Sequence, residues 1–202
     1  MTSIHPTKDA LIQTVATLME HNTVESITSD QVLEVSGISR GSLYHHFEDF
    51  SEVIEAAQVF RFGQFVDRSC AILAQVVAAA RSREELVESL KGVTRATQSD
   101  LMQSARMERI GAISKSVNHP RMQIALGQEQ ERLTQAICDI YREACEKGWG
   151  NKAIDPRTVA VFIQAYTMGK AVDDFTPLHM SGDNWNFLID EVLEKIFLPG
   201  KN

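Results

Sequence analysis

The feature that most constrains this fold is a twenty-residue stretch, TSDQVLEVSGISRGSLYHHF, at residues 28–47. Thr28 can cap a helix that begins just before a set of apolar positions. Gly37 stands where a helix end requires a left-handed residue, which glycine adopts without steric cost. Ser39 can then cap a second helix. Two short helices joined by a tight turn that contains glycine are typical of the DNA-binding helix-turn-helix motif.

The second helix of this pair, residues 40–47, has one apolar and one polar face at 100° per residue. Leu43 and Phe47 lie four residues apart, and we expect both to be buried. The other side chains can hydrogen-bond to phosphates or base edges. The predicted DNA-contacting residues are Thr28, Ser29, Arg40, Gly41, Ser42, Tyr44, His45 and His46. Spacing alone is equally compatible with a helical hairpin that has a purely structural role.

The residue types narrow this choice. The run VLEVSGISRGSLYHHF, residues 32–47, resembles the N-terminal signature of the TetR family of bacterial transcriptional repressors. That signature contains Ala-Gly-Val-Ser, then a basic residue, Gly, Thr or Ser, Leu and Tyr. The resemblance is dense over about twenty residues and looser over residues 7–62. It implies an N-terminal three-helix DNA-binding domain, a larger helical domain that binds a ligand and dimerises, and no enzymatic activity.

Three residues depart from the family pattern. Leu33 stands where the family usually has alanine, so we expect the two helices to pack further apart. Asn22 stands where the first helix usually ends in glycine, a mild change because asparagine tolerates the left-handed region. Phe50 replaces the lysine that usually opens the following helix, which removes one expected contact with the DNA backbone.

The charge of the chain is unfavourable for indiscriminate binding to nucleic acid. The net charge is −7, and three basic residues face nine acidic ones within residues 1–61. No acidic residue occurs between Val35 and Phe47, where the contacts are expected, and His45 and His46 could gain protons near phosphates. We therefore expect modest intrinsic affinity, dependence on two half-sites and low tolerance of salt.

The rest of the chain has helical spacing of its apolar residues and no pattern of period two. The expected helices cover about residues 7–21, 50–80, 100–117 and 121–147, with three more that begin after caps at Ser82, Asp155 and Asp183. The predicted fold class is therefore all-α. The predicted domains are a helix-turn-helix DNA-binding domain at residues 7–67 and a ligand-binding and dimerisation domain at residues 68–202.

The last two expected helices carry more apolar surface than a single neighbour can cover. The run VAVFIQAYTMGKAV, residues 159–172, is apolar nearly all round, and the final helix has a full apolar stripe. A two-fold partner would bury these faces in a four-helix bundle, as the resemblance also implies. We therefore expect a homodimer on a palindromic DNA operator. The alternative is that the two stripes close the core of a monomer.

The resemblance further implies a small-molecule inducer, whose identity the sequence does not reveal. Residues expected to contact it are Met102, Met107, Phe162 and Tyr166, because Met and aromatic side chains can line an adaptable apolar pocket. Each of them is also a plausible core residue. We expect no metal and no cofactor, since His119, Asp173, Asp174 and His179 lack a compact ligand spacing.

The expected location is the cytoplasm, without a membrane partner. No apolar run approaches the ~18 residues needed to cross a bilayer, and the first residues lack a secretory pattern. Cys70, Cys138 and Cys145 are expected to be free thiols. No GxSxG, GxxxxGK or HExxH motif is present. The alternatives to a DNA-binding regulator are an all-helical enzyme with a dispersed site and a helix-turn-helix module that contacts protein.

Overall fold

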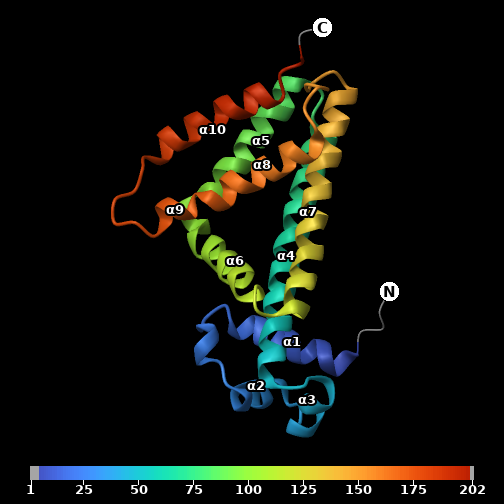
Figure 1. The fold of residues 1–202 in the computed structure, drawn as a ribbon, viewed down its shortest axis with the longest axis vertical. Coiled ribbons are helices and arrows are strands. Elements are labelled where there is room, and N and C mark those ends of the chain that lie inside the picture. The colour runs from blue at the N-terminus through green and yellow to red at the C-terminus, as the bar shows by residue number, and fades with distance from the viewer. Residues whose placement is uncertain (1–4, 201–202) are drawn as a thin grey trace. The chain divides into compact units, whose positions relative to one another are not determined.

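The computed structural model describes residues 5–200, which are all-helical and contain no strand (Figure 1). The α-helices are α1 (Pro6–Leu18), α2 (Ser29–Ser36), α3 (Arg40–His46), α4 (Phe50–Ala79), α5 (Arg83–Gln98), α6 (Gln103–Ser116), α7 (Pro120–Glu146), α8 (Pro156–Gly169), α9 (Ala171–Asp174) and α10 (Gly182–Ile196). Two 3-10 turns, η1 (Val24–Ser26) and η2 (Asp100–Met102), lie between them. The all-α fold class predicted from the sequence is confirmed.

The described chain divides into two compact units. Unit 1 consists of residues 5–65 and 115–126, and unit 2 consists of residues 66–114 and 127–200. The predicted division after residue 67 left residues 115–126 in the C-terminal domain, whereas the structure groups them with the helix-turn-helix. This grouping comes from tertiary contacts that no local sequence pattern marks. The functions assigned to the two domains stay predictions.

Unit 1 is organised around an apolar core shared by α1, η1, α2, α3 and the first part of α4. The buried core residues are Leu11, Val15, Ala16, Ile27, Val32, Leu43, Phe47, Val53, Ile54 and Ala57. Helix α1 therefore holds the two helices of the motif in place through buried apolar contacts. Leu33 and Phe50 are partly buried against the same core, so Phe50 contributes packing where the family has a lysine.

Asn22 does not adopt the left-handed conformation expected for it. Helix α1 already ends at Leu18, and no described residue other than glycine has a positive φ. The side-chain amide of Asn22 instead donates to the carbonyl of Leu18 at 2.8 Å. A side-chain hydrogen bond thus satisfies the helix end, and left-handed backbone is not needed there.

In unit 2, α8 and α10 lie beside α5, and α7 lies beside α4 (Figure 1). Arg83, at the start of α5, donates to the carbonyl of Phe197 at 2.8 Å and to the carboxylate of Glu194 at 2.7 Å. Lys91 donates to the same carboxylate at 2.8 Å. The buried apolar cluster around these helices contains Val77, Leu86, Val87, Leu90, Ile140, Tyr141, Ala144, Cys145, Val159 and Phe197. Charged contacts at its edge therefore fix α10 against α5.

Two details of the C-terminal helices differ from the sequence predictions. Helix α10 is capped by Ser181, whose hydroxyl accepts from the backbone N–H of Asn184, and the expected cap Asp183 lies inside its first turn. The 100–117 helix begins only at Gln103, because residues 100–102 form η2. Ser82 and Asp155 cap α5 and α8 as predicted.

The three cysteines are free thiols, as predicted. Cys138 and Cys145 are buried and Cys70 is half-buried, and burial raises the pKa of each thiol. A thiol with a raised pKa carries little thiolate at neutral pH and reacts slowly. Among residues 5–200, no helix is both long and apolar enough to cross a membrane.

Candidate nucleic-acid interface

The turn between α2 and α3 has the geometry that the sequence predicts. The hydroxyl of Thr28 accepts from the backbone N–H of Gln31 at 3.3 Å and so caps α2. Gly37 ends α2 with φ 67°, in the left-handed region. The hydroxyl of Ser39 then accepts from the backbone N–H of Ser42 at 3.1 Å and caps α3. Local hydrogen bonds and one glycine therefore set the angle at which α3 leaves the turn.

Helix α3 has a buried back and an exposed front. Leu43 is 0% exposed and Phe47, directly after the helix, is 3% exposed. Gly41, Tyr44 and His45 are exposed on the remaining surface. The two apolar anchors thus hold a short helix whose other side chains are free to reach a large ligand surface.

The predicted contact residues fall into two groups by exposure. Those exposed are Thr28, Arg40, Gly41, Tyr44 and His45, and those half-buried are Ser29, Ser42 and His46. The Ser42 hydroxyl shares a 2.9 Å hydrogen bond with the hydroxyl of Ser39, so it also belongs to the helix cap. Arg40 forms an ion pair with Asp30 of α2. The structure therefore brings all eight residues to one helix-turn-helix, and contact with DNA stays a prediction.

Two residues that the sequence did not assign also reach this surface. The ring of His5, which precedes α1, lies 4.3 Å from the ring of His46, centroid to centroid. The ammonium of Lys8 lies 4.9 Å from the centroid of the Phe47 ring. Desolvation and the positive charges of His5, His45 and Lys8 lower the pKa of His46. Only the packing of α1 on α3 brings these groups together, and no local spacing predicts it.

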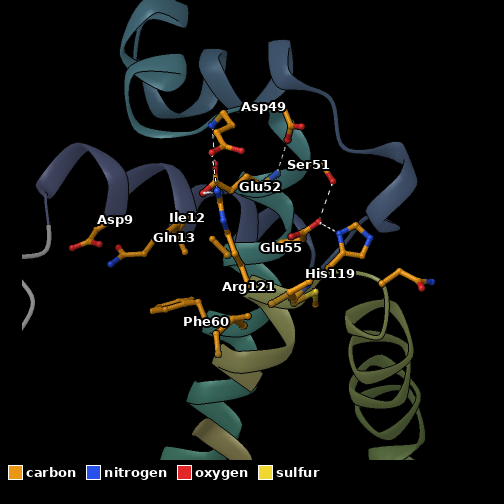
Figure 2. Close-up of a pocket in the computed structure, with 17 residues that line it drawn as sticks. Asp9, Ile12, Gln13, Asp49, Ser51, Glu52, Glu55, Phe60, His119 and Arg121 are labelled. Atoms are coloured by element: carbon orange, nitrogen blue, oxygen red, sulfur yellow. Dashed lines mark hydrogen bonds and ion pairs between the residues drawn. The ribbon is translucent and has the colours of Figure 1, made fainter. Parts of the chain in front are cut away.

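The acidic residues of unit 1 gather around a pocket of about 750 Å³ (Figure 2). Five of the nine acids counted in residues 1–61 line it: Asp9, Glu48, Asp49, Glu52 and Glu55. Its floor is apolar and includes Ile12 and Phe60. The negative charge that was unfavourable for DNA binding is therefore largely concentrated at this pocket and not on α3.

Residues 115–126 bring basic groups to the same pocket. Arg121 contacts Glu48 at 2.8 Å and Glu52 at 3.5 Å. The Nδ1 atom of His119 lies 2.7 Å from the Glu55 carboxylate (Figure 2). Counting charges in residues 1–61 alone missed these partners, because they come from a segment more than fifty positions later. The carboxylates at this pocket are therefore partly neutralised within unit 1.

The four residues predicted to contact an inducer are only partly brought together. The rings of Phe162 and Tyr166 lie 5.7 Å apart in an edge-to-face arrangement. The Tyr166 hydroxyl lies 3.4 Å from that of Thr94, and burial raises the pKa of Tyr166. Met102 and Met107 are exposed. The assignment of these residues to a ligand site stays a prediction.

Unit 2 also contains a buried charge cluster that the sequence did not indicate. Arg106 is 0% exposed, and its guanidinium makes two hydrogen bonds to Asp174, at 2.6 and 2.8 Å. It also donates to the carbonyls of Thr97 and Ser99, and Lys170 contacts Asp174 at 3.1 Å. Asp174 is therefore a structural ion-pair partner. Within the described chain, no group of three or more His, Cys, Asp or Glu side chains is arranged to hold a metal ion.

Comparisons with known proteins identify the fold. No protein-family model and no curated protein sequence matches the chain. Solved structures match nearly its whole length. GusR from Salmonella enterica has a TM-score of 0.63 at 18% identity, with 98% of each chain covered. A TetR-family regulator from Cytophaga hutchinsonii has a TM-score of 0.68 at 14% identity, with 97% of this chain and 98% of that chain covered.

A third structure, from Mesorhizobium loti and assigned to the TetR family of transcriptional regulators, has a TM-score of 0.69 at 14% identity over 93% of each chain. The helical arrangement defines a fold class, with an N-terminal helix-turn-helix followed by a larger C-terminal helical part. Within that class, the chain has the fold of the TetR-family transcriptional regulators. The fold that the signature at residues 32–47 implied is therefore confirmed.

Proposed function

We propose that this protein is a sequence-specific DNA-binding transcriptional regulator that acts as a homodimeric repressor and is released by a small-molecule inducer. The observation that carries the proposal is the arrangement of α3, which is anchored from behind by Leu43 and Phe47 and exposes Arg40, Gly41, Tyr44 and His45. This arrangement suits insertion of the helix into the major groove. The TetR-family fold supports it.

Each exposed side chain has a chemically suitable partner on DNA. Arg40 can bind a phosphate or make two hydrogen bonds to guanine, and Tyr44 and His45 can hydrogen-bond to phosphates or base edges. Gly41 has no side chain, so the backbone can approach a groove wall closely. We assign Thr28 and Ser29 to backbone contacts, because they lie at the N-terminus of α2, where free N–H groups favour phosphate.

The dimer is supported by the apolar surface that α8 and α10 leave uncovered. Phe187 and Leu188 of α10 are 70% and 55% exposed, and Val161 and Phe162 of α8 are also exposed. A groove of about 440 Å³, lined mostly by apolar side chains, lies between the two helices. Exposed apolar side chains in this number favour association. Two copies of the α8–α10 pair would form a four-helix bundle and place two α3 helices on one palindromic operator.

We assign the response to an inducer to unit 2, around Phe162 and Tyr166. Helix α4 belongs to unit 1 as far as Phe65 and to unit 2 from Val66, so a change in its direction can reach α3. The coupling must be reciprocal: operator DNA lowers inducer affinity by the same factor by which inducer lowers DNA affinity.

The test is selection of DNA from a random pool by the full-length protein, followed by gel-shift titration of the selected duplex. We expect an enriched palindrome and retardation that weakens by about tenfold or more in Arg40→Ala and Tyr44→Ala. Arg68→Ala is the matched control, because it removes one exposed positive charge of unit 2. Equal losses of DNA affinity in Arg40→Ala and Arg68→Ala would show that the binding is non-specific charge attraction.

Both alternatives predict an outcome of this experiment that differs from that of a DNA-binding regulator. A helix-turn-helix module that contacts protein enriches no DNA sequence at any salt concentration. An all-helical enzyme with a dispersed site also enriches none and instead turns over a substrate. Either result would contradict the proposed function.

A further inference from the structure

Three histidine rings form a continuous row at the end of α3. The ring centroids of His5 and His46 are 4.3 Å apart, and those of His45 and His46 are 5.1 Å apart. His45 is exposed on the α3 surface, and His5 is exposed just before α1. The row therefore extends the exposed surface of α3 towards the start of α1.

The groups around His46 are the imidazoles of His5 and His45 and the ammonium of Lys8. Desolvation lowers the pKa of His46 most, and the charges of His5 and Lys8 on the α1 side and of His45 in α3 lower it further. None of the three imidazoles makes a hydrogen bond or ion pair with another residue of the described range 5–200. Repulsion from its neighbours therefore disfavours the protonated form of His46 in the free protein.

The carboxylates that follow the row in sequence are engaged elsewhere. Glu48 contacts Arg121 at 2.8 Å, and Asp49 accepts from the backbone N–H of Glu52 at 2.9 Å as the cap of α4. Neither of these carboxylates is therefore paired with the histidine row to compensate positive charge on it. An external anion can do so, and a DNA phosphate carries one negative charge at every pH at which histidine titrates.

We propose that His5, His45 and His46 form a phosphate-contact site that binds the DNA backbone with uptake of protons, so that operator affinity rises as the pH falls. This inference rests on the proposed DNA-binding function. The phosphate replaces repulsion among the imidazolium rings by attraction, and His45 and His46 lie in the last turn of α3, where the helix dipole also favours positive charge. Lys8 adds a permanent charge beside the row.

The expected size follows from linkage between protons and DNA. Each proton taken up on binding changes the affinity by up to about tenfold per pH unit, in the range between the pKa values of the free and bound states. Histidine is the side chain whose charge changes between about pH 6 and 8, so the slope is measured over that range. We expect affinity to fall at least about fivefold per unit between these values, which corresponds to net uptake of slightly less than one proton for each operator bound.

The experiment is a fluorescence-anisotropy titration of the selected duplex with the full-length protein, between about pH 6 and 8 at a constant ionic strength of about 0.1 M. The triple variant His5→Gln/His45→Gln/His46→Gln is expected to remove most of the pH dependence, and His46→Gln part of it. His179→Gln is the control, because it removes a titratable imidazole of unit 2 and should leave the slope unchanged. His46→Arg supplies a permanent charge and is expected to bind more tightly than the native protein at about pH 8.

Calorimetry in two buffers of different ionisation enthalpy then counts the protons taken up directly. Affinity that is independent of pH, no proton uptake, or an unchanged slope in the triple variant would overturn the histidine site and leave DNA binding intact. If the triple variant does not fold by circular dichroism, the slopes of the three single variants decide in the same way. Failure of every duplex to bind at any pH would overturn the proposed function itself.

Discussion

Arg40, the first residue of α3, forms an ion pair with Asp30, near the start of α2. The two side chains are 57% and 79% exposed, so the pair contributes little to the stability of unit 1. Its position matters more than its strength. The arginine that we assign to DNA is already bound to a carboxylate in the free protein, and it must exchange that carboxylate for a phosphate or a base.

Replacing Asp30 by Asn should therefore strengthen DNA binding. The change frees Arg40 and removes one negative charge next to the DNA backbone, which we expect to raise affinity by about two- to fivefold at low salt and less at high salt. Gel-shift titration at two salt concentrations measures the effect. Glu34→Gln is the matched control, because it also removes one exposed acid of α2. Unlike Asp30, Glu34 forms no ion pair with a described residue. A weaker complex in Asp30→Asn would show that the carboxylate orients Arg40 for contact.

Short-range features of unit 1 could be predicted from the sequence because their causes lie within a few residues. Gly37 is left-handed because its neighbours form a tight turn. Ser39 caps α3 because its hydroxyl accepts a hydrogen bond from the backbone N–H of Ser42, only three residues later. Leu43 and Phe47 are buried because they share one helical face. The same reasoning was less exact at α10, where Ser181 and Asp183 are both good caps and spacing does not choose between them.

Long-range features could not be predicted because packing decides them. His5 and Lys8 join the surface of α3 only after α1 has folded against it. Arg121 reaches the acids of unit 1 from a segment that a charge count by position assigns elsewhere. Arg106 and Asp174 are 68 positions apart, and neither residue carries a local signal of its partner.

The two glycines of the helix-turn-helix should respond differently to alanine. Gly37→Ala places a side chain at φ 67° and should lower the free energy of unfolding by about 1 kcal/mol. Gly41→Ala has ordinary helical backbone and only a 3.9 Å neighbour, so stability should be unchanged or rise by about 0.5–1 kcal/mol. Gly41→Ala should nevertheless weaken DNA binding if the groove wall approaches this position. Urea unfolding and gel-shift titration separate the two effects, and equal stability losses would contradict the assigned turn.

The buried pair Arg106–Asp174 should dominate the acid stability of unit 2. Hydrogen bonds from Arg106, and then from Lys170, lower the pKa of Asp174 below its usual value near 3.8, against the opposing effect of burial. A carboxyl group with a lowered folded-state pKa stabilises the protein above the unfolded pKa, and this stability is lost as the pH falls through the folded value. Unfolding in urea at about pH 7 and at successively lower pH measures the loss.

Asp174→Asn should remove this contribution at neutral pH. The variant leaves Arg106 buried without its counter-charge, and we expect a loss of about 3–5 kcal/mol in the free energy of unfolding. Its stability should then depend less on pH below about 4 than that of the native protein. Asp183→Asn, an exposed acid at the start of α10, is the control and should change stability by less than about 0.5 kcal/mol. Equal effects of the two substitutions would mean that the buried pair is not a stabilising element.

The apolar surface of α8 and α10 makes the association state testable. Phe187→Glu, Leu188→Glu and their double variant place charge on exposed apolar positions, so the folded monomer should keep its helical content. If this surface is a two-fold interface, each introduced charge is buried close to the same charge of the partner. We therefore expect each substitution to weaken the dimer by about 2–5 kcal/mol. Sedimentation velocity at micromolar concentration measures this change.

Leu101→Glu is the control for these variants, because Leu101 is an apolar residue of η2, outside α8 and α10, and is even more exposed than Phe187 and Leu188. It should leave the native association state unchanged. Loss of the dimer should also weaken binding to a palindromic duplex much more than binding to a single half-site, because one α3 helix makes only half of the contacts. If the native protein sediments as a monomer at these concentrations, the apolar faces of α8 and α10 have another role. DNA binding would then require assembly of two copies on the operator.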